Sequence, residues 1–276
     1  MKNKKVFKWF LYIVLIGYAA LTFFPFLWAN SASFKSYSEI TGGGLNIFPE
    51  SPTIAAYEKL FTIDEHFVRW IVNSLVICIV GTTLNVFLNS MAGYSLARLH
   101  FRGKNLVFYA ILVSIMVPAQ VLLIPNYLIV KSLGLLNTYS AVILPVAVNA
   151  TFIFMMRQFY INFPRDVEEA AAIDGLGRLG IFFRISMPLA KPAIATQSVF
   201  VFLGFWNEFL KPKLYLADPA KYTLTVGIQT MMSRYSGITQ WDEVMAASVI
   251  SLIPILIIYV VLNKYFLQGI RMDGEK

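Results

Sequence analysis

Long apolar stretches alternate with shorter polar segments along the chain. Six stretches are apolar for about 20 residues, the length that an α-helix needs to cross a bilayer. They cover roughly residues 9–29, 68–92, 105–130, 138–160, 190–211 and 243–266. Runs such as VISLIPILIIYVVL are apolar at every position, without the alternation of a membrane β-strand. Because lipid offers no partner to an unpaired backbone group, the pattern predicts six transmembrane helices and an all-α membrane protein.

The polar segments between these stretches differ in charge. Basic residues gather at the N-terminus and in the segments that follow the second and fourth stretches, among them Lys2, Lys4, Lys5, Lys8, Arg98, Arg102, Lys104, Arg165, Arg178, Arg184 and Lys191. The segment 30–67 is net acidic and is predicted to be an external loop. The positive-inside rule then places both termini in the cytoplasm. The segment 212–242 fits less well, because it contains Lys213, Lys221 and Arg234 and yet has to lie outside.

Composition narrows the class of protein further. The chain has 276 residues, of which 58% are hydrophobic and 14% charged, whereas a soluble domain is about 25% charged. We therefore treat residues 1–276 as one multi-pass membrane domain. The net charge of +8 is explained by the cytoplasmic segments, so we expect no nucleic-acid partner. Cys78 is the single cysteine and the two histidines lie apart, so we expect no metal site and no membrane-embedded enzyme.

One polar segment, VEEAAAIDGLGRLGIFFRISMPLAKP at residues 167–192, separates the fourth and fifth stretches. Pro164 suits the first helical position, acidic residues suit the first turns, and alanines favour helix. Gly175 is a natural stop in the left-handed conformation. These features predict a short cytoplasmic helix at about 164–174. From composition alone, a plain amphipathic connector and a docking element are equally good interpretations.

The same segment carries a spaced motif. Glu169, Ala170, Ala171, Gly175, Ile185 and Pro188 match E-A-A-x3-G-x9-I-x-L-P, with Met187 in place of the leucine. This motif resembles the cytoplasmic signature loop of permease subunits in binding-protein-dependent ABC importers. NSMAGYSLARLHFRGK and FLGFWNEFLKP are similar to the sugar-transporting branch and, within it, to the second permease of a maltose-type pair. The C-terminal QGIRMDGEK departs from that branch, so no regulatory contact is assigned to the tail.

The resemblance implies a type I ABC importer transmembrane domain in a bacterial-type plasma membrane, with a cytoplasmic coupling helix. It implies import of a carbohydrate, most simply a di- or oligosaccharide, with coupling to ATP hydrolysis through Glu169, Ala170, Ala171, Asp174, Gly175 and Leu176. The implied partners are a homologous sister permease, two ATPase subunits, an extracytoplasmic sugar-binding protein and membrane lipid. The chain has no G-x-x-x-x-G-K-[ST] phosphate loop, so we expect ATP and Mg on the partner subunits and no enzyme activity here.

Polar residues inside the spans are candidates for a substrate pathway, because burying them in a membrane is costly. The candidates are Gln120, Asn149, Trp206, Asn207 and Glu208, where the tryptophan offers an aromatic face for a sugar ring. The alternative is that these groups only bond neighbouring helices.

Two other readings of the function remain open at this point. One keeps the importer and changes the cargo to glycerol phosphate or another small solute. The other is a secondary transporter, which usually shows internal repeats that we do not find here. The sequence does not name the sugar.

Overall fold

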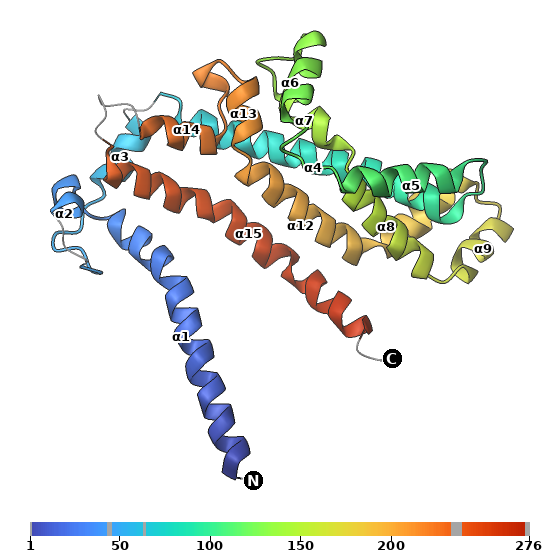
Figure 1. The fold of residues 1–276 in the computed structure, drawn as a ribbon, viewed down its shortest axis with the longest axis horizontal. Helices are drawn as coiled ribbons and strands as arrows, with labels where there is room; N and C mark the ends of the chain where they lie inside the picture. Colours follow the sequence, from blue (N-terminus) through green and yellow to red (C-terminus); the bar gives the residue numbers. More distant parts are fainter. Residues whose placement is uncertain (1, 43–45, 63–64, 233–238, 274–276) are drawn as a thin grey trace. The chain divides into compact units, whose positions relative to one another are not determined.

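The computed structural model describes residues 2–42, 46–62, 65–232 and 239–273, and within these ranges the chain is helical with connecting turns and no β-strand (Figure 1). Residues 274–276, at the end of the tail, lie outside the described residues. The chain divides into two compact units. Unit 1 comprises residues 1–68 and 227–253, and unit 2 comprises residues 69–226 and 254–276.

Unit 1 contains α1 (Lys2–Ala32), α2 (Tyr37–Thr41), α3 (Ala55–Thr62) and the first part of α15 (Trp241–Asp273). The hydrophobic side chains of α1 from Phe7 to Leu27 are exposed, as expected of a helix surrounded by lipid. An ion pair connects α3 to α15, because Lys59 Nζ lies 3.4 Å from Asp242 Oδ2 and 3.7 Å from Glu243 Oε1. Both carboxylates occupy the first turn of α15, where the helix dipole favours negative charge.

Unit 2 contains most of the remaining helices. They are α4 (Phe67–Arg98), α5 (Lys104–Ile115), α6 (Leu123–Ser132), α7 (Tyr139–Ala147), α8 (Ala150–Asn162), α12 (Lys191–Asn207), α13 (Leu210–Tyr215) and, at the boundary with unit 1, α14 (Leu224–Met231). Within the unit, α8 packs against both α5 and α12 (Figure 1). Helix α8 thus lies in contact with two other helices of unit 2.

Helices α4 and α8 approach closely at Gly93. A Cβ atom on Gly93 would lie 2.7 Å from Met156 Cβ and 2.9 Å from the backbone nitrogen of Arg157. Real Cβ atoms are almost never found so near a neighbour, so the crossing depends on the absence of a side chain at this position. Small residues at helix crossings are a common means of close packing in membrane proteins.

The described residues support only part of the six expected spans. Three helices are long and apolar enough to cross a membrane, at Phe7–Ala32, Phe67–Arg98 and Trp241–Val261. Two more spans are bent pairs of helices, α7 with α8 at 45° and Arg178–Leu189 with α12 at 77°. By length and composition, the described residues therefore offer three spans, or five with the bent pairs.

The span predicted over 105–130 is not one continuous helix. Helix α5 has 12 residues and measures about 18 Å, which is short of the roughly 30 Å hydrocarbon core. Turns at 116–122 separate it from α6. Pro118 lies in these turns, and a proline both lacks the N–H for the helix ladder and disfavours helix at the residue before it. Hydropathy counts apolar residues and does not detect such a break.

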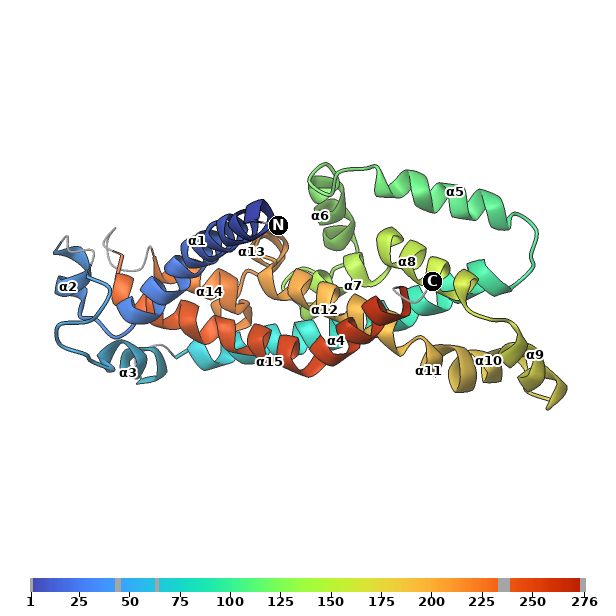
Figure 2. The same cartoon turned by 90° about the horizontal axis from the view of Figure 1, so that it is seen from below.

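The polar segment after α8 folds into short elements. They are α9 (Asp166–Ile173), α10 (Arg178–Ile181), a π-helical turn η1 (Phe182–Ser186) and α11 (Met187–Leu189). Figure 2 shows α9, α10 and α11 following one another at one end of unit 2. The helix expected at 164–174 is thus shorter, and Pro164 precedes it instead of taking its first position. Arg165 is the N-cap residue, so Pro164 lies one residue before the cap.

Candidate functional site

Helix α9 ends in a well-defined stop. Gly175 has φ of +85°, the left-handed conformation that the sequence predicted. The N–H of Leu176 donates to Ala171 O at 3.0 Å, and the N–H of Gly175 donates to Ala172 O at 3.1 Å. This pair of bonds is a Schellman motif, which satisfies carbonyl groups left over at the helix end. The direction in which the chain leaves α9 is therefore fixed by local hydrogen bonds.

Replacing Gly175 with valine is expected to destabilise this end of α9 by about 1–2 kcal/mol, because an L-residue is strained in the left-handed region. Faster amide exchange in α9 of the purified protein would measure the effect. Gly177→Ala is the matched control, since Gly177 has φ of −70° and an added Cβ would meet nothing within 4 Å. Equal exchange rates in the two variants would contradict the expectation.

The inner face of α9 is joined to the end of α4. Glu168 is 9% exposed; its Oε1 accepts a hydrogen bond from Arg98 Nε at 3.2 Å, and its Oε2 lies 3.1 Å from the same nitrogen. Ser186 Oγ donates to the same carboxylate at 2.9 Å, and Arg98 Nη2 donates to Phe163 O at 2.7 Å. A buried carboxylate is tolerated because a cation and a hydroxyl both satisfy it. The bonds connect α4, α9 and η1 directly.

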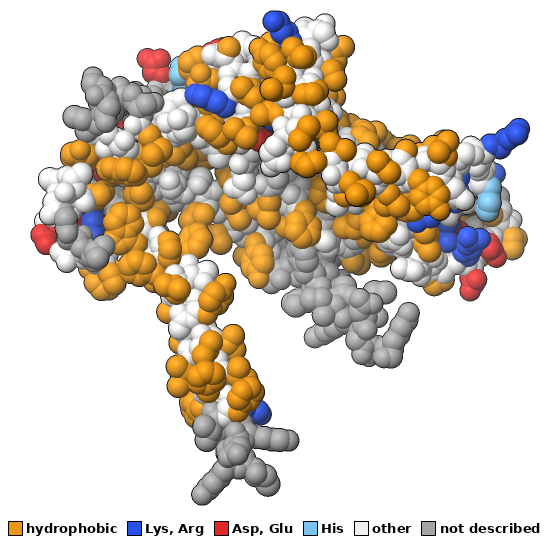
Figure 3. All heavy atoms as spheres, viewed as in Figure 1, with side chains coloured by type: hydrophobic (Ala, Val, Ile, Leu, Met, Phe, Trp, Pro, Cys, Tyr) orange, Lys and Arg blue, Asp and Glu red, His pale blue; other side chains and the backbone are white. Residues whose placement is uncertain are grey.

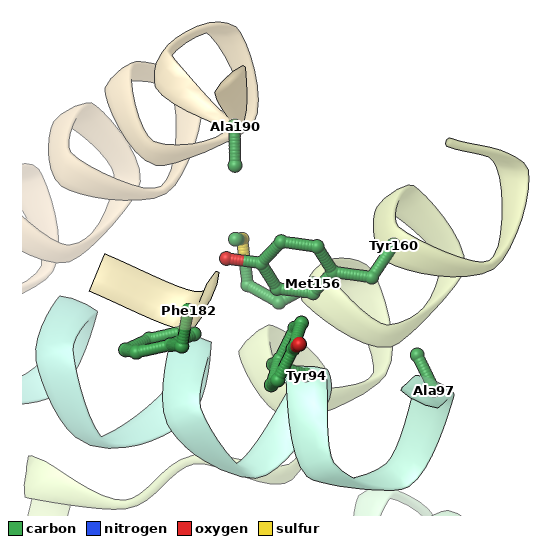
Figure 4. Close-up of a cluster of buried hydrophobic side chains, with 6 residues drawn as sticks. All are labelled: Tyr94, Ala97, Met156, Tyr160, Phe182 and Ala190. Atoms are coloured by element: carbon green, nitrogen blue, oxygen red, sulfur yellow. The ribbon is translucent and has the colours of Figure 1, made fainter. Parts of the chain in front are cut away.

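Aromatic packing supports the same junction. Tyr94 of α4 lies between Tyr160 of α8 and Phe182 of η1, with ring centroids 5.4 Å and 5.1 Å away. Figure 4 shows these rings with Met156 and the small side chains that complete the cluster, Ala97 and Ala190. Such a cluster is close-packed and resists deformation. The base of the α9 segment is therefore held rigidly against α4 and α8.

The outer face of α9 carries a different set of side chains. Glu169, Ala170 and Ile173 are exposed, and helical spacing places them opposite Glu168 and Ala171. Ile173 is 87% exposed although it is fully apolar. Figure 3 shows several charged side chains gathered around this end of unit 2. We expected Ala171 to act together with Ala170, but Ala171 is 6% exposed and faces the protein's own interior.

A second set of polar residues lies at the break between α7 and α8. Asn85 of α4 donates to Val146 O at 2.8 Å, and Asn89 donates to Ala147 O at 3.2 Å. Asn89 Oδ1 also accepts from the backbone N–H of Asn149 at 2.9 Å. Backbone groups freed by a break within a membrane helix need such partners. The two asparagines therefore stabilise the bend between α7 and α8.

A pocket of about 290 Å³ adjoins this break. Helices α4, α7, α8, α12 and α13 contribute to it, with Glu208 from the link between the last two. Its lining includes Asn85, Asn149, Phe200, Gly204, Glu208 and Lys211. Apolar and aromatic walls with a few polar groups are typical of small-molecule sites. The pocket lies entirely within unit 2.

The pocket brings together two of the residues that the sequence singled out for a pathway, Asn149 and Glu208. Trp206 is buried and stacks on Phe202 at a centroid distance of 5.8 Å, so it is part of the packed interior. Asn207, the last residue of α12, and Gln120, in the turns after α5, are exposed and do not line the pocket.

Sequence reasoning overlooked several residues of these sites. Asn85 and Asn89 form an i, i+4 polar pair inside an apolar span, and this signal could have revealed them. The acidic residues in the first turns of the polar helix were expected only to interact favourably with the helix dipole. The pairing of Glu168 with Arg98 across 70 residues had no signal in the sequence. Lys211 and Gly204 likewise join the pocket only through the packing of α12 and α13.

Comparison with known proteins gives matches over most of the chain. Residues 89–272 match the family described as binding-protein-dependent transport system inner membrane component. The arabinooligosaccharides transport system permease protein AraQ of Halalkalibacterium halodurans is 33% identical over 277 residues, covering 100% of this chain and 99% of that protein. The polygalacturonan/rhamnogalacturonan transport system permease protein YtcP of Bacillus subtilis is 34% identical over the full length of both chains.

The fold has a counterpart among solved structures. A chain from the crystal structure of a bacterial ABC transporter involved in the import of the acidic polysaccharide alginate superposes with a TM-score of 0.88. The two sequences are 25% identical, and the match covers 96% of this chain and 98% of the other. The two chains thus share one overall fold.

Proposed function

The chain belongs to the family of binding-protein-dependent transport system inner membrane components, and from this premise we propose how its parts serve transport. It is the permease subunit of a carbohydrate ABC importer, with the all-helical fold of a type I importer transmembrane domain. It is a permease component and not the ATPase of the system. A di- or oligosaccharide is the cargo that the relatives' names support.

We propose that α9 is the coupling helix and docks on a cytoplasmic ATPase subunit. The observation that carries this proposal is the contrast between its two faces. The inner face is fixed to α4 by the Arg98–Glu168 pair, whereas the outer face exposes Ile173 to 87% beside Glu169. An exposed apolar residue on a short polar helix suits insertion into a groove on a partner. A docked, rigidly based helix would pass movement of the ATPase to the spans.

Ile173→Asn is expected to weaken this docking about tenfold or more, because burial of an isoleucine contributes roughly 1.5–3 kcal/mol. The measurement is the amount of ATPase that co-purifies with the permease pair, together with ATP-driven sugar uptake. Ala172→Asn is the control, since it places the same polar side chain at an exposed position on the flank of the same helix. If the wild-type amount of ATPase co-purified with the Ile173→Asn variant, the docking proposal would be contradicted.

We further propose six spans with both termini in the cytoplasm. Five spans are available by length and composition, and α5 with α6 would supply the sixth as a broken span. The orientation is supported by basic residues at one level of the fold, where Arg98 ends α4, Lys104 begins α5 and Arg165 precedes α9. Segment 30–67 would then be the external loop. The orientation is tested with single cysteines placed at Glu58 and Arg102. A membrane-impermeant reagent added from outside is expected to label the cysteine at position 58 and not the one at position 102.

The partners follow from the same assignment. The family is binding-protein-dependent, so an extracytoplasmic sugar-binding protein delivers the cargo. We propose that a homologous sister permease completes the pathway and that two ATPase subunits bind ATP and Mg. The whole chain, residues 1–276, would serve as one permease domain. Membrane lipid covers its exposed apolar surface, and no nucleic acid is involved.

A further inference from the structure

Two helix breaks meet at the pocket in unit 2. One is the 45° bend between α7 and α8, where Asn149 is the N-cap residue of α8. The other follows α12, where Glu208 is extended with ψ of 126° before α13 begins. Irregular backbone within a membrane is tolerated where it is buried in protein or lines a cavity. In transporters, discontinuous helices of this kind surround the substrate.

The charged groups in this pocket neutralise one another. Lys211 Nζ lies 3.0 Å from Glu208 Oε2, and Glu208 Oε1 accepts the backbone N–H groups of Leu210 at 3.1 Å and Lys211 at 3.4 Å. No other ionisable residue contributes to the lining. The pocket therefore has no formal net charge, although it presents both a donor and an acceptor. An anionic ligand would have to compete with Glu208 for Lys211.

The rest of the lining provides the other features that a sugar ring requires. Asn149 Oδ1 accepts from the backbone N–H groups of Thr151 and Phe152, whereas its amide nitrogen makes no hydrogen bond to a described residue and can donate to a hydroxyl group. Phe152, Phe200 and Phe205 supply apolar faces against which the C–H side of a ring can pack. The volume of about 290 Å³ lies at the lower limit of small-molecule pockets, roughly 300–1,000 Å³.

We propose that this pocket is a sugar subsite of this subunit itself, holding one uncharged sugar unit of the cargo during translocation. Asn149 and Lys211 donate to sugar hydroxyls, Glu208 accepts from them, and the phenylalanines hold the ring. The proposal rests on the carbohydrate importer function and adds the chemical class of the unit that is bound. It disfavours acidic sugars and phosphate esters at this position, although some relatives carry acidic polysaccharides by name.

Gly204 gives direct access to the subsite for a test. It lines the pocket, and an added Cβ would meet nothing within 4 Å. A larger side chain at this position can therefore occupy the pocket without displacing its neighbours. The complete importer is reconstituted in lipid nanodiscs without binding protein. Calorimetric titrations then compare the sugar affinity of the Gly204→Leu variant with that of the wild type. The probes are maltotriose, arabinotriose, cellotriose and trigalacturonate.

At least one neutral trisaccharide is expected to bind the wild type, with trigalacturonate about tenfold weaker. Gly204→Leu is expected to weaken neutral-sugar binding roughly tenfold or more while the thermal unfolding midpoint is unchanged. Gly17→Leu is the matched control, because Gly17 is also a helical glycine whose added Cβ would meet nothing within 4 Å. Unchanged affinity in Gly204→Leu, no binding of any neutral probe, or equal affinity for trigalacturonate would overturn the proposal.

Glu208→Gln provides an independent arm. The amide oxygen can still accept the two backbone N–H groups, but the countercharge of Lys211 is lost. The affinity for trigalacturonate relative to the neutral probe is expected to rise about fivefold. An unchanged ratio would show that charge at this pocket does not select the sugar. If the wild-type importer takes up a neutral sugar and Gly204→Leu binds that sugar with unchanged affinity, the subsite alone is refuted. If the wild-type importer takes up no carbohydrate, the importer function is refuted.

Discussion

Arg98→Leu is expected to separate α9 from α4 and to destabilise this junction by about 3–5 kcal/mol, the typical effect of removing one partner from a buried ion pair. Glu168 would then be left with Ser186 as its remaining side-chain partner. Because α9 would lose its connection to the spans, ATP hydrolysis should continue while sugar uptake falls at least about tenfold. The measurement is the number of ATP molecules consumed per sugar imported by the reconstituted importer.

Two further variants separate coupling from general damage. Arg102→Leu removes an exposed arginine from the turn after α4 and should leave the ATP-to-sugar ratio unchanged. Combining Arg98→Glu with Glu168→Arg reverses the pair and should recover part of the uptake, which a purely steric effect would not allow. If Arg98→Leu kept the wild-type ratio, the connection between α9 and α4 would have no part in coupling.

Gly93→Val is expected to lower stability by about 1–3 kcal/mol through overpacking, even though valine favours helix more than glycine does. The steric reason is that the added Cβ would lie 2.9 Å from backbone of α8, which cannot rotate away as a side chain can. The thermal unfolding midpoint of the detergent-purified protein measures the effect.

The control for the Gly93 variant is Gly17→Val in α1, where the added Cβ would meet nothing within 4 Å. That substitution should leave the midpoint unchanged or raise it slightly. If both variants unfolded at the wild-type temperature, the result would contradict the close contact between α4 and α8 at Gly93.

Local physics explains which features could be predicted from the sequence. An apolar stretch in lipid has to satisfy its backbone groups internally, so the helices at Phe67–Arg98 and Trp241–Asp273 followed from hydropathy. The stop of α9 at Gly175 was equally predictable, because glycine is the residue that adopts positive φ without strain. The broken span after α5 was missed, since Pro118 changes backbone geometry and not hydropathy.

The candidate sites were predictable only in part. Asn149 and Glu208 stood out because polar groups within spans are costly, and both do line the pocket. Gln120 stood out for the same reason, and Trp206 stood out as an aromatic face for a sugar ring. Neither lines the pocket, because Gln120 is exposed and Trp206 lies in the packed interior. Polarity marks a residue as unusual within a span, whereas its direction depends on neighbouring helices.

The sequence by itself determined that this chain is a helical membrane protein, that a short polar helix interrupts it, and which family motif that helix carries. Only the tertiary structure decided which face of α9 is fixed and which is free, with Ala171 turned inward and Ile173 outward. It also decided that Arg98 meets Glu168 and that Lys211 neutralises a pocket beside Asn149. The physical reason is the distance in sequence between the groups that interact. Backbone conformation and hydropathy depend on residues close together in the sequence, whereas a buried ion pair or a pocket requires groups from separate helices to meet.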